Sequence, residues 1–230
     1  TFLAADDGPT CAGASSPAGN LPEVYYRFKL ARPTLLEAVP KSSEGAHSLA
    51  LLSSCGGAPI ECSQETLTKE LQPGTYWLAV EGPLSASPMS GAGSFDLDLG
   101  FRDLGAIKKA CDTAPKLERN KTVKGSLRGS ASRFAATCVP GSGVDRIYRV
   151  EIQDSATYEF NVTATGGWSG GIALRDTCAA DSSETACAST DDGYLSTELA
   201  RGTYYLVVKG GDGTNAGDFE LSFRRSPNMP

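Results

Sequence analysis

An internal repeat constrains the fold of this chain more than any other feature of its sequence. Residues 73–82 read PGTYWLAVEG and residues 201–210 read RGTYYLVVKG, so nearly the same ten residues occur twice. Further blocks repeat in the same order and with near-equal spacing. They are 23–30 with 145–152, 48–55 with 171–178, 67–82 with 195–210, and 92–101 with 216–225. Such self-similarity indicates two copies of one module, which we place at 1–103 and 104–230.

Each repeated block has the pattern of a β-strand. In 76–81, Tyr76, Leu78 and Val80 alternate with other residues, and in 219–224 three apolar residues alternate with Glu, Ser and Arg. Period two with one apolar face is typical of a half-buried antiparallel strand. The sequence therefore predicts an all-β fold of two tandem antiparallel β-sandwich domains, jelly-roll-like in type. The Gly-rich stretch 210–218 is expected to join two strands as a hairpin loop.

These residues also resemble a known family. The pattern VYYRF, then LxPGTYWLAVEG, then GSFDLDLGF of the first copy is similar to the bacterial pre-peptidase C-terminal domain, and the resemblance extends to the second copy. The resemblance implies a small, non-catalytic β-sandwich of a secreted or cell-surface bacterial protein. It also implies a binding or spacer role toward an extracellular polymer, a polysaccharide or a matrix protein. The alternative function is a structural subunit that assembles with neighbouring subunits by strand donation.

Seven cysteines are many for a reducing compartment. Cys55 and Cys62 flank a short loop in the first copy, and Cys178 and Cys187 flank the equivalent loop in the second. This placement predicts one loop-clamping disulfide per copy and an oxidising, extracellular location. A zinc site is the alternative, but it needs four ligands at tighter spacing, and His47 is the one imidazole in the sequence.

The second copy has two more cysteines, Cys111 and Cys138, on either side of a stretch that alternates Val123, Gly125 and Leu127 like an opening strand. Cys111 and Cys138 are also assigned to disulfides. Cys11 is the counterpart of Cys138, and the counterpart of Cys111 falls before residue 1. We therefore expect the first copy to lack its opening strand and Cys11 to be unpaired or intermolecular. Upstream residues, another subunit, or a cleaved peptide held by Cys11 are the open explanations.

Charge and composition disfavour several functions. A net charge of −6 disfavours nucleic-acid binding, because phosphate contacts need a basic surface. The apolar runs are too short to predict a membrane span. The stretch GWSGG (167–171) fits the G-x-S-x-G motif of hydrolases, but no histidine follows Ser169, so we interpret it as a Gly-rich turn. The chain is therefore predicted not to be an enzyme.

Two sets of residues are candidates for binding. Acidic pairs in turns could hold calcium, which prefers several oxygen ligands, although Asp is also a common turn residue. The calcium candidates are Asp6, Asp7, Asp191, Asp192, Asp212 and Asp218. Aromatic side chains near turns could form an exposed platform for a polymer. The platform candidates are Trp168, Tyr25 and Tyr194.

Overall fold

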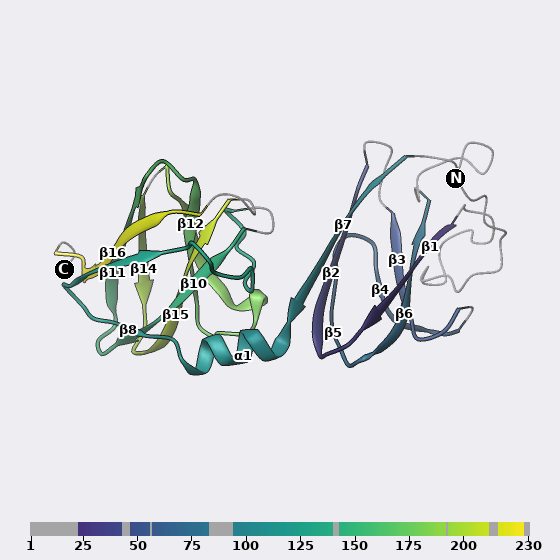
Figure 1. Ribbon diagram of the computed structural model, residues 1–230. Coiled ribbons are helices and arrows are strands. Elements are labelled where there is room, and N and C mark those ends of the chain that lie inside the picture. The colour runs from purple at the N-terminus through teal and green to yellow at the C-terminus, as the bar shows by residue number, and fades with distance from the viewer. Residues whose placement is uncertain are drawn as a thin grey trace. The chain divides into compact units, whose positions relative to one another are not determined.

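The computed structural model describes residues 23–42, 47–55, 57–82, 94–139, 143–191, 193–211 and 216–227. The chain divides into two compact units, Thr1–Leu104 and Gly105–Pro230, here called unit 1 and unit 2. Almost all regular structure is β, as Figure 1 shows for each unit. The predicted all-β class with antiparallel sandwich sheets is confirmed.

Unit 1 is a sandwich of two antiparallel sheets. One sheet has the order β1-β6-β3-β4 and the other β5-β2-β7. The strands are β1 (Glu23–Leu30), β2 (Thr34–Lys41), β3 (Ser48–Leu52), β4 (Pro59–Ser63), β5 (Leu67–Leu71), β6 (Gly74–Glu81) and β7 (Asp96–Asp103). Both sheets contribute to one core, in which Leu36 on β2 and Leu78 on β6 are fully buried. Alternation along each strand supplies the apolar face that this core needs.

Unit 2 contains two larger sheets, β13-β12-β15-β10-β8 and β14-β11-β16-β9. Its strands are β8 (Lys116–Leu117), β9 (Thr122–Ser126), β10 (Asp145–Ile152), β11 (Ala156–Thr165), β12 (Gly170–Arg175), β13 (Glu184–Ser189), β14 (Tyr194–Leu199), β15 (Gly202–Gly210) and β16 (Asp218–Arg225). A short 3-10 helix spans Asp181–Ser183. On β16, Phe219, Leu221 and Phe223 enter the core between the sheets.

The strand pairings of the two units correspond position by position. In unit 1, β1 pairs with β6 so that Tyr26 lies opposite Leu78. In unit 2, β10 pairs with β15 so that Tyr148 lies opposite Leu206. The sequence alignment already matches these residues, and the two registers agree with it. A residue of one unit can therefore be compared directly with its aligned residue in the other.

Two local predictions differ from the structure. The stretch 210–218 does not close a hairpin, because β15 and β16 lie in different sheets and the chain crosses between them there. A helix that the alternation did not predict, α1 (Leu104–Asp112), begins where the two units meet in sequence. Its buried residues, Ile107 and Ala110, are three positions apart and therefore lie on one helix face.

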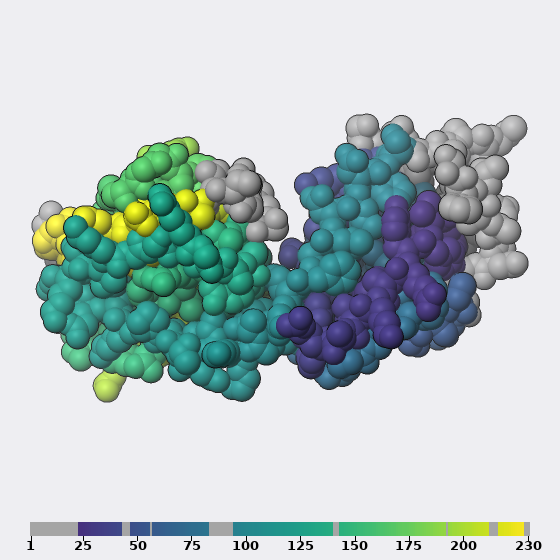
Figure 2. All heavy atoms as spheres, viewed as in Figure 1, coloured from purple at the N-terminus to yellow at the C-terminus, as the bar shows by residue number. Residues whose placement is uncertain are grey.

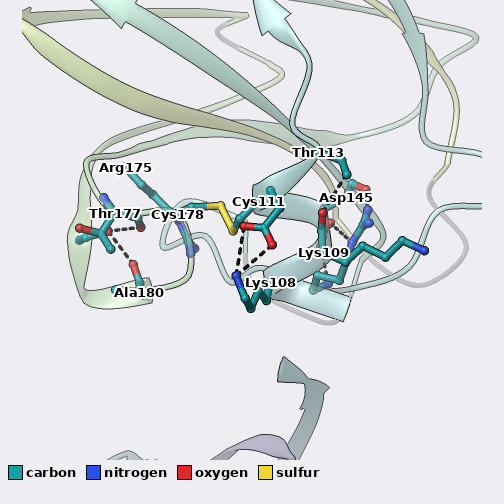
Figure 3. The surroundings of a disulfide bond; sticks show 12 residues. Lys108, Lys109, Cys111, Thr113, Asp145, Arg175, Thr177, Cys178 and Ala180 are labelled. Atoms are coloured by element: carbon teal, nitrogen blue, oxygen red, sulfur yellow. Dashed lines mark hydrogen bonds and ion pairs between the residues drawn. A yellow bond between two sulfur atoms is a disulfide. The ribbon is translucent and has the colours of Figure 1, made fainter. Parts of the chain in front are cut away.

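The cysteines of unit 2 pair differently from the prediction. Cys111 on α1 bonds Cys178, which follows β12 (Figure 3). Cys138 bonds Cys187 on β13. The predicted Cys178–Cys187 clamp is wrong because Cys187 lies opposite Ala173 in the β12–β13 pair. Cys178 is five residues beyond Ala173, and strands rise roughly 3.3 Å per residue.

The cysteines of unit 1 show the same offset. Cys62 on β4 lies opposite Ala50 on β3, whereas Cys55 follows the end of β3. Cys62 is disulfide-bonded and Cys55 is a free, exposed thiol, so the predicted Cys55–Cys62 bond is wrong. Cys11 lies outside the described residues. In neither unit, therefore, do these two cysteines bond each other across the loop.

Candidate binding surface

The predicted calcium residues fall in several places. Asp6, Asp7, Asp192 and Asp212 lie outside the described residues. Asp191 is exposed in the turn before β14, and Asp218 is exposed at the start of β16. Within the described part of the chain, no group of three or more His, Cys, Asp or Glu side chains is arranged to hold a metal ion. The calcium site stays a prediction.

Trp168 was expected as an exposed platform, and this is wrong. The residue is only 6% exposed. Its indole Nε1 donates a hydrogen bond to the Asp218 carbonyl oxygen at 2.8 Å, and its ring packs edge-on against Phe219 with centroids 6.4 Å apart. The indole approaches the backbone so closely that a Cβ added at Gly217 would lie 2.1 Å from Trp168 Cδ1. Trp168 therefore closes one end of the unit 2 core.

Tyr25, the second platform candidate, is half-buried on the outer face of β1. It packs against a small cluster of Ala50, Leu52 and Ala79. Its hydroxyl donates to Glu23 Oε2 at 2.6 Å. Burial, and then the hydrogen bond to Glu23, raise the pKa of Tyr25 above its ordinary value of 10.0. The ring and the hydroxyl are both engaged within unit 1, which leaves little of Tyr25 for a ligand.

Tyr194 is the one platform candidate whose ring is well exposed, at 42%. It begins β14 and lies opposite Asn161 on β11. Its hydroxyl is near the Glu159 carboxylate and contributes slightly to the lowered pKa of Glu159, which is on the same outward face of β11, two residues from Asn161. The aromatic ring therefore lies on the outward face of the sheet, near Glu159, with its surface open to solvent.

Glu159 connects Tyr194 to a cation on the next strand. The β11–β16 pairing places Glu159 opposite Arg224. Arg224 Nε donates to Glu159 Oε2 at 2.6 Å, and Ser226 Oγ donates to Oε1 at 2.9 Å. The Arg224 hydrogen bond, followed by that of Ser226, lowers the pKa of the Glu159 carboxyl below its ordinary value of 4.5. The carboxylate is thus fixed, while the Arg224 side chain is 57% exposed.

A shallow depression of about 600 Å³ adjoins this cluster at the ends of β11, β14 and β16. It is lined by Ser155, Ala156, Thr157, Glu198, Leu199, Ala200, Arg225 and Ser226. Ser226 belongs to both groups, and Glu198 shares the outward side of β14 with Tyr194. We call Tyr194, Glu159, Arg224 and Ser226 together with this depression the Tyr194 face. It combines an exposed ring with fixed donors and acceptors, which is what recognition of a hydroxyl-rich polymer requires.

Sequence reasoning found Tyr194 but missed Glu159, Arg224 and Ser226. The alternation of 219–224 does place Arg224 on a polar strand face. Its partner Glu159 is 65 positions away, on a strand that has no block in the repeat alignment. The pairing of β11 with β16 brings them together, and no local pattern specifies that pairing.

No described helix is long and apolar enough to cross a membrane. No family model matches the chain, and no curated protein matches it. Among solved structures, it is similar to a pre-peptidase C-terminal domain of collagenase from Bacillus anthracis. That match has 20% identity, covers 48% of this chain and 93% of that chain, and has a TM-score of 0.36.

Two further solved structures show lower TM-scores. One is an isomalto-dextranase of Arthrobacter globiformis T6 complexed with panose, with 10% identity, 89% of this chain and 32% of that chain covered, and a TM-score of 0.23. The other is an empty virus-like particle of Cowpea Mosaic Virus, with 14% identity and a TM-score of 0.21. That match covers 97% of this chain and 91% of that chain.

Proposed function

We propose that this chain is a non-catalytic module of an exported bacterial protein and that its Tyr194 face binds an extracellular polysaccharide. The observation that supports this most directly is the exposed Tyr194 ring, which lies near Glu159 and the Arg224 guanidinium that Glu159 binds. The resemblance of the strand motifs to pre-peptidase C-terminal domains supports the non-catalytic role. The two disulfides of unit 2 support export, because such bonds persist in oxidising compartments.

The chemistry of the face favours a sugar polymer over other partners. Sugar rings present flat C–H surfaces that stack on an aromatic ring, and their hydroxyls both donate and accept hydrogen bonds. The Tyr194 ring supplies the first kind of contact, and Arg224 and Ser226 supply the second. Glu159, whose side chain is only 9% exposed, holds these two side chains in place. The cluster spans the three adjacent strands β14, β11 and β16, so an extended chain can cross several strands.

Replacing Tyr194 with alanine is expected to weaken polysaccharide binding about tenfold, or about 1.4 kcal/mol, because the stacking surface is removed. Affinity electrophoresis against a panel of soluble polysaccharides measures this directly. Tyr194→Phe keeps the ring and should bind within threefold of the wild type. Ile60→Ala, at a side chain that is 40% exposed in unit 1, is the matched control and should bind normally.

Two results would contradict the proposal. One is an unchanged affinity of Tyr194→Ala for a polysaccharide that the wild type binds. The other is a wild type that binds none of the polysaccharides in the panel and instead co-sediments with collagen. That result would indicate that the ligand is a matrix protein. Thermal unfolding of each variant, followed by circular dichroism, separates a lost contact from a lost fold.

Binding should also depend on pH through Glu159. The folded-state pKa of Glu159 is lowered, so the ionised carboxylate and its bonds are fully present above the ordinary pKa of 4.5. They are lost as the pH falls through the lowered pKa. The affinity should therefore be constant from pH 7 to about pH 5 and should fall in more acidic buffers. Glu159→Gln should bind more weakly at pH 7 and lack this acidic step, and an identical step in that variant would contradict the role of Glu159.

Assembly by strand donation remains the second candidate function, and one observation in unit 1 favours it. Among the described residues, β7 is an edge strand of its sheet, and two of its large apolar residues, Leu99 and Phe101, are 36% and 45% exposed. Exposed apolar edges are the sites at which another strand can add. A size-exclusion profile showing concentration-dependent oligomers would support this function, whereas a monomer at all concentrations would weaken it.

A further inference from the structure

Aligned residues of the two units differ sharply in burial along one strand. In unit 2, Phe219, Leu221 and Phe223 on β16 are 1%, 0% and 2% exposed. Their aligned residues in unit 1 are Phe95, Leu97 and Leu99. Phe95 and Leu97 are only partly buried, and Leu99 is 36% exposed. The same apolar face is therefore covered in one unit and partly open in the other.

The cover in unit 2 is the segment that follows α1. β9 pairs with β16 from Asp218 to Ser222, and Asn120 N–H donates to the Phe223 carbonyl oxygen at 2.8 Å. Val123 packs against the core, and Leu127 is completely buried in it. Gly125 lies so close that an added Cβ would be 2.3 Å from Phe219 Cζ. β8 pairs with the edge of β10 and buries Leu117.

Unit 1 shows no equivalent cover among its described residues. There, β1 pairs only with β6, and β7 only with β2. Figure 2 shows β1 in purple and β7 in blue-teal at the surface of unit 1. Tyr26 and Phe28 on β1 are partly buried, whereas the aligned Tyr148 and Val150 of unit 2 are 3% and 0% exposed. We call Tyr26, Phe28, Phe95, Leu97, Leu99 and Phe101 the open side of unit 1.

A free thiol in unit 1 occupies the position of a bonded one in unit 2. Cys55 follows β3 as Cys178 follows β12, and the blocks SLALLSSC and GIALRDTC align the two. Cys178 bonds Cys111 of α1, with their Cα atoms 5.9 Å apart (Figure 3). Cys55 is exposed and free. In unit 2, one continuous segment thus provides both the cysteine that bonds this position and the strand that covers this face.

Charge makes the same segment complementary to unit 1. Residues 104–128 contain seven Lys and Arg and two Asp and Glu. Residues 1–103 contain six Lys and Arg and twelve Asp and Glu. Within unit 2, Lys124 on β9 pairs with Glu220 on β16 at 3.1 Å. The aligned residue in unit 1 is Asp96, which is exposed on β7 and retains the same charge. A basic strand added beside β7 would therefore meet an acidic partner at the register used in unit 2.

We propose that the open side and Cys55 bind a segment of the same kind as residues 104–128, a basic helix with one cysteine followed by a strand of the β9 type. The strand adds to β7, its apolar residues cover Phe95, Leu97 and Leu99, and its cysteine bonds Cys55. This inference is independent of polysaccharide binding at the Tyr194 face.

The bond forms by thiol–disulfide exchange. Cys55 and the incoming cysteine together lose two protons and two electrons, and a disulfide oxidant such as oxidised glutathione takes them up and becomes two thiols. The exposed thiol of Cys55 is accessible to this exchange. Docking of the strand raises the local concentration of the second thiol, so the reaction should depend on the sequence of the segment and not only on its cysteine.

The test uses the full chain and a synthetic peptide of residues 104–128 in a glutathione redox buffer. Intact-mass spectrometry should show one peptide per chain, and peptide mapping should place the bond at Cys55. A scrambled peptide with its cysteine at the same position should give at least tenfold less adduct. Equal yields from the two peptides, no adduct, or an adduct at another cysteine would overturn the proposal.

Two variants locate the docking surface. Leu99→Asp should lower the adduct yield at least tenfold, because an acidic side chain replaces an apolar one where the strand docks. Ile60→Asp, at the similarly exposed apolar residue of β4, should stay within twofold of the wild type. Cys55→Ser should form no adduct but should still bind a fluorescent Cys111→Ser peptide in an anisotropy titration. An unchanged yield from Leu99→Asp would show that the open side does not dock the segment.

Discussion

Replacing Asp145 with alanine is expected to lower the free energy of unfolding of unit 2 by about 3–5 kcal/mol. Asp145 is completely buried at the start of β10. Its carboxylate accepts the backbone N–H of Arg133 and that of Phe134, the latter at 2.8 Å, and pairs with Arg133 Nε at 3.0 Å. The substitution removes the acceptor of two backbone donors and of Arg133 Nε, while the guanidinium keeps its bond to the Asp145 carbonyl oxygen.

Tryptophan fluorescence can measure this effect in unit 2 alone. The chain has two tryptophans, and Trp168 is buried in unit 2, so a Trp77→Phe background reports the denaturant unfolding of that unit. Asp112→Ala is the control, because its pair with Lys108 is exposed and should contribute less than about 0.5 kcal/mol. If Asp145→Ala lowered the free energy of unfolding by less than about 1 kcal/mol, this would contradict the stabilising role of the Asp145 carboxylate.

The pH dependence of the wild type gives a second measure of Asp145. Burial raises the pKa of its carboxyl above the ordinary value of 3.8, and this outweighs the hydrogen bonds from Arg133 and Phe134. A carboxyl whose folded-state pKa is raised contributes stability that is fully present below pH 3.8. This stability is lost as the pH rises through the folded-state pKa. Asp145→Asn, which keeps the shape and an acceptor oxygen, should remove this dependence and should lose less stability than alanine.

Removing the Cys138–Cys187 bond should lower the free energy of unfolding of unit 2 by about 4 kcal/mol. The two cysteines are 49 residues apart, and cross-linking a loop of that length restricts the unfolded chain by about this amount. The double variant Cys138→Ser with Cys187→Ser removes the bond without leaving a spare thiol. Cys55→Ser, at a free exposed residue, is the control and should change the stability by less than about 0.5 kcal/mol.

Peptide mapping distinguishes this connectivity from the loop clamp that the sequence suggested. No Lys or Arg lies between Cys178 and Cys187, so trypsin leaves both in one peptide, whereas a Glu-specific protease cuts between them at Glu184. After that cut, Cys178 should be found bonded to Cys111, and Cys187 to Cys138. A Cys178–Cys187 peptide pair would refute both bonds together with the stability prediction.

Much of the fold followed from local patterns. The repeated blocks predicted strands at both copies of TYxLxV, and alternation identified which of their residues face the core. It also predicted the strand that became β9 from Val123, Gly125 and Leu127. These predictions succeed because the alternation of apolar and polar residues that marks a half-buried strand can be read from a short run of consecutive residues. The helix α1 was missed because its buried residues, Ile107 and Ala110, are too few to produce a helical pattern.

The candidate site was less predictable. Trp168 was misjudged because a Gly-rich turn normally exposes its side chains, and here the neighbouring backbone at Gly217 allows the indole to pack inward. The exposure of Tyr194 was expected, but its neighbours Glu159 and Arg224 lie on strands whose pairing spans 65 positions. The choice of strand neighbours depends on the packing of the whole sandwich and not on either strand alone.

The sequence by itself determined that this chain forms β-strands in two related sets and which face of each strand is apolar, because side-chain alternation fixes both. Only the tertiary structure decided which strands are neighbours, which cysteines meet, and which apolar faces are covered. Cys55 and Cys178 illustrate the difference, since their blocks are aligned but only Cys178 has a bonded helix beside it. The physical reason is that covering a face and closing a disulfide need groups far apart in sequence to come within contact distance, and this is set by how the sheets pack.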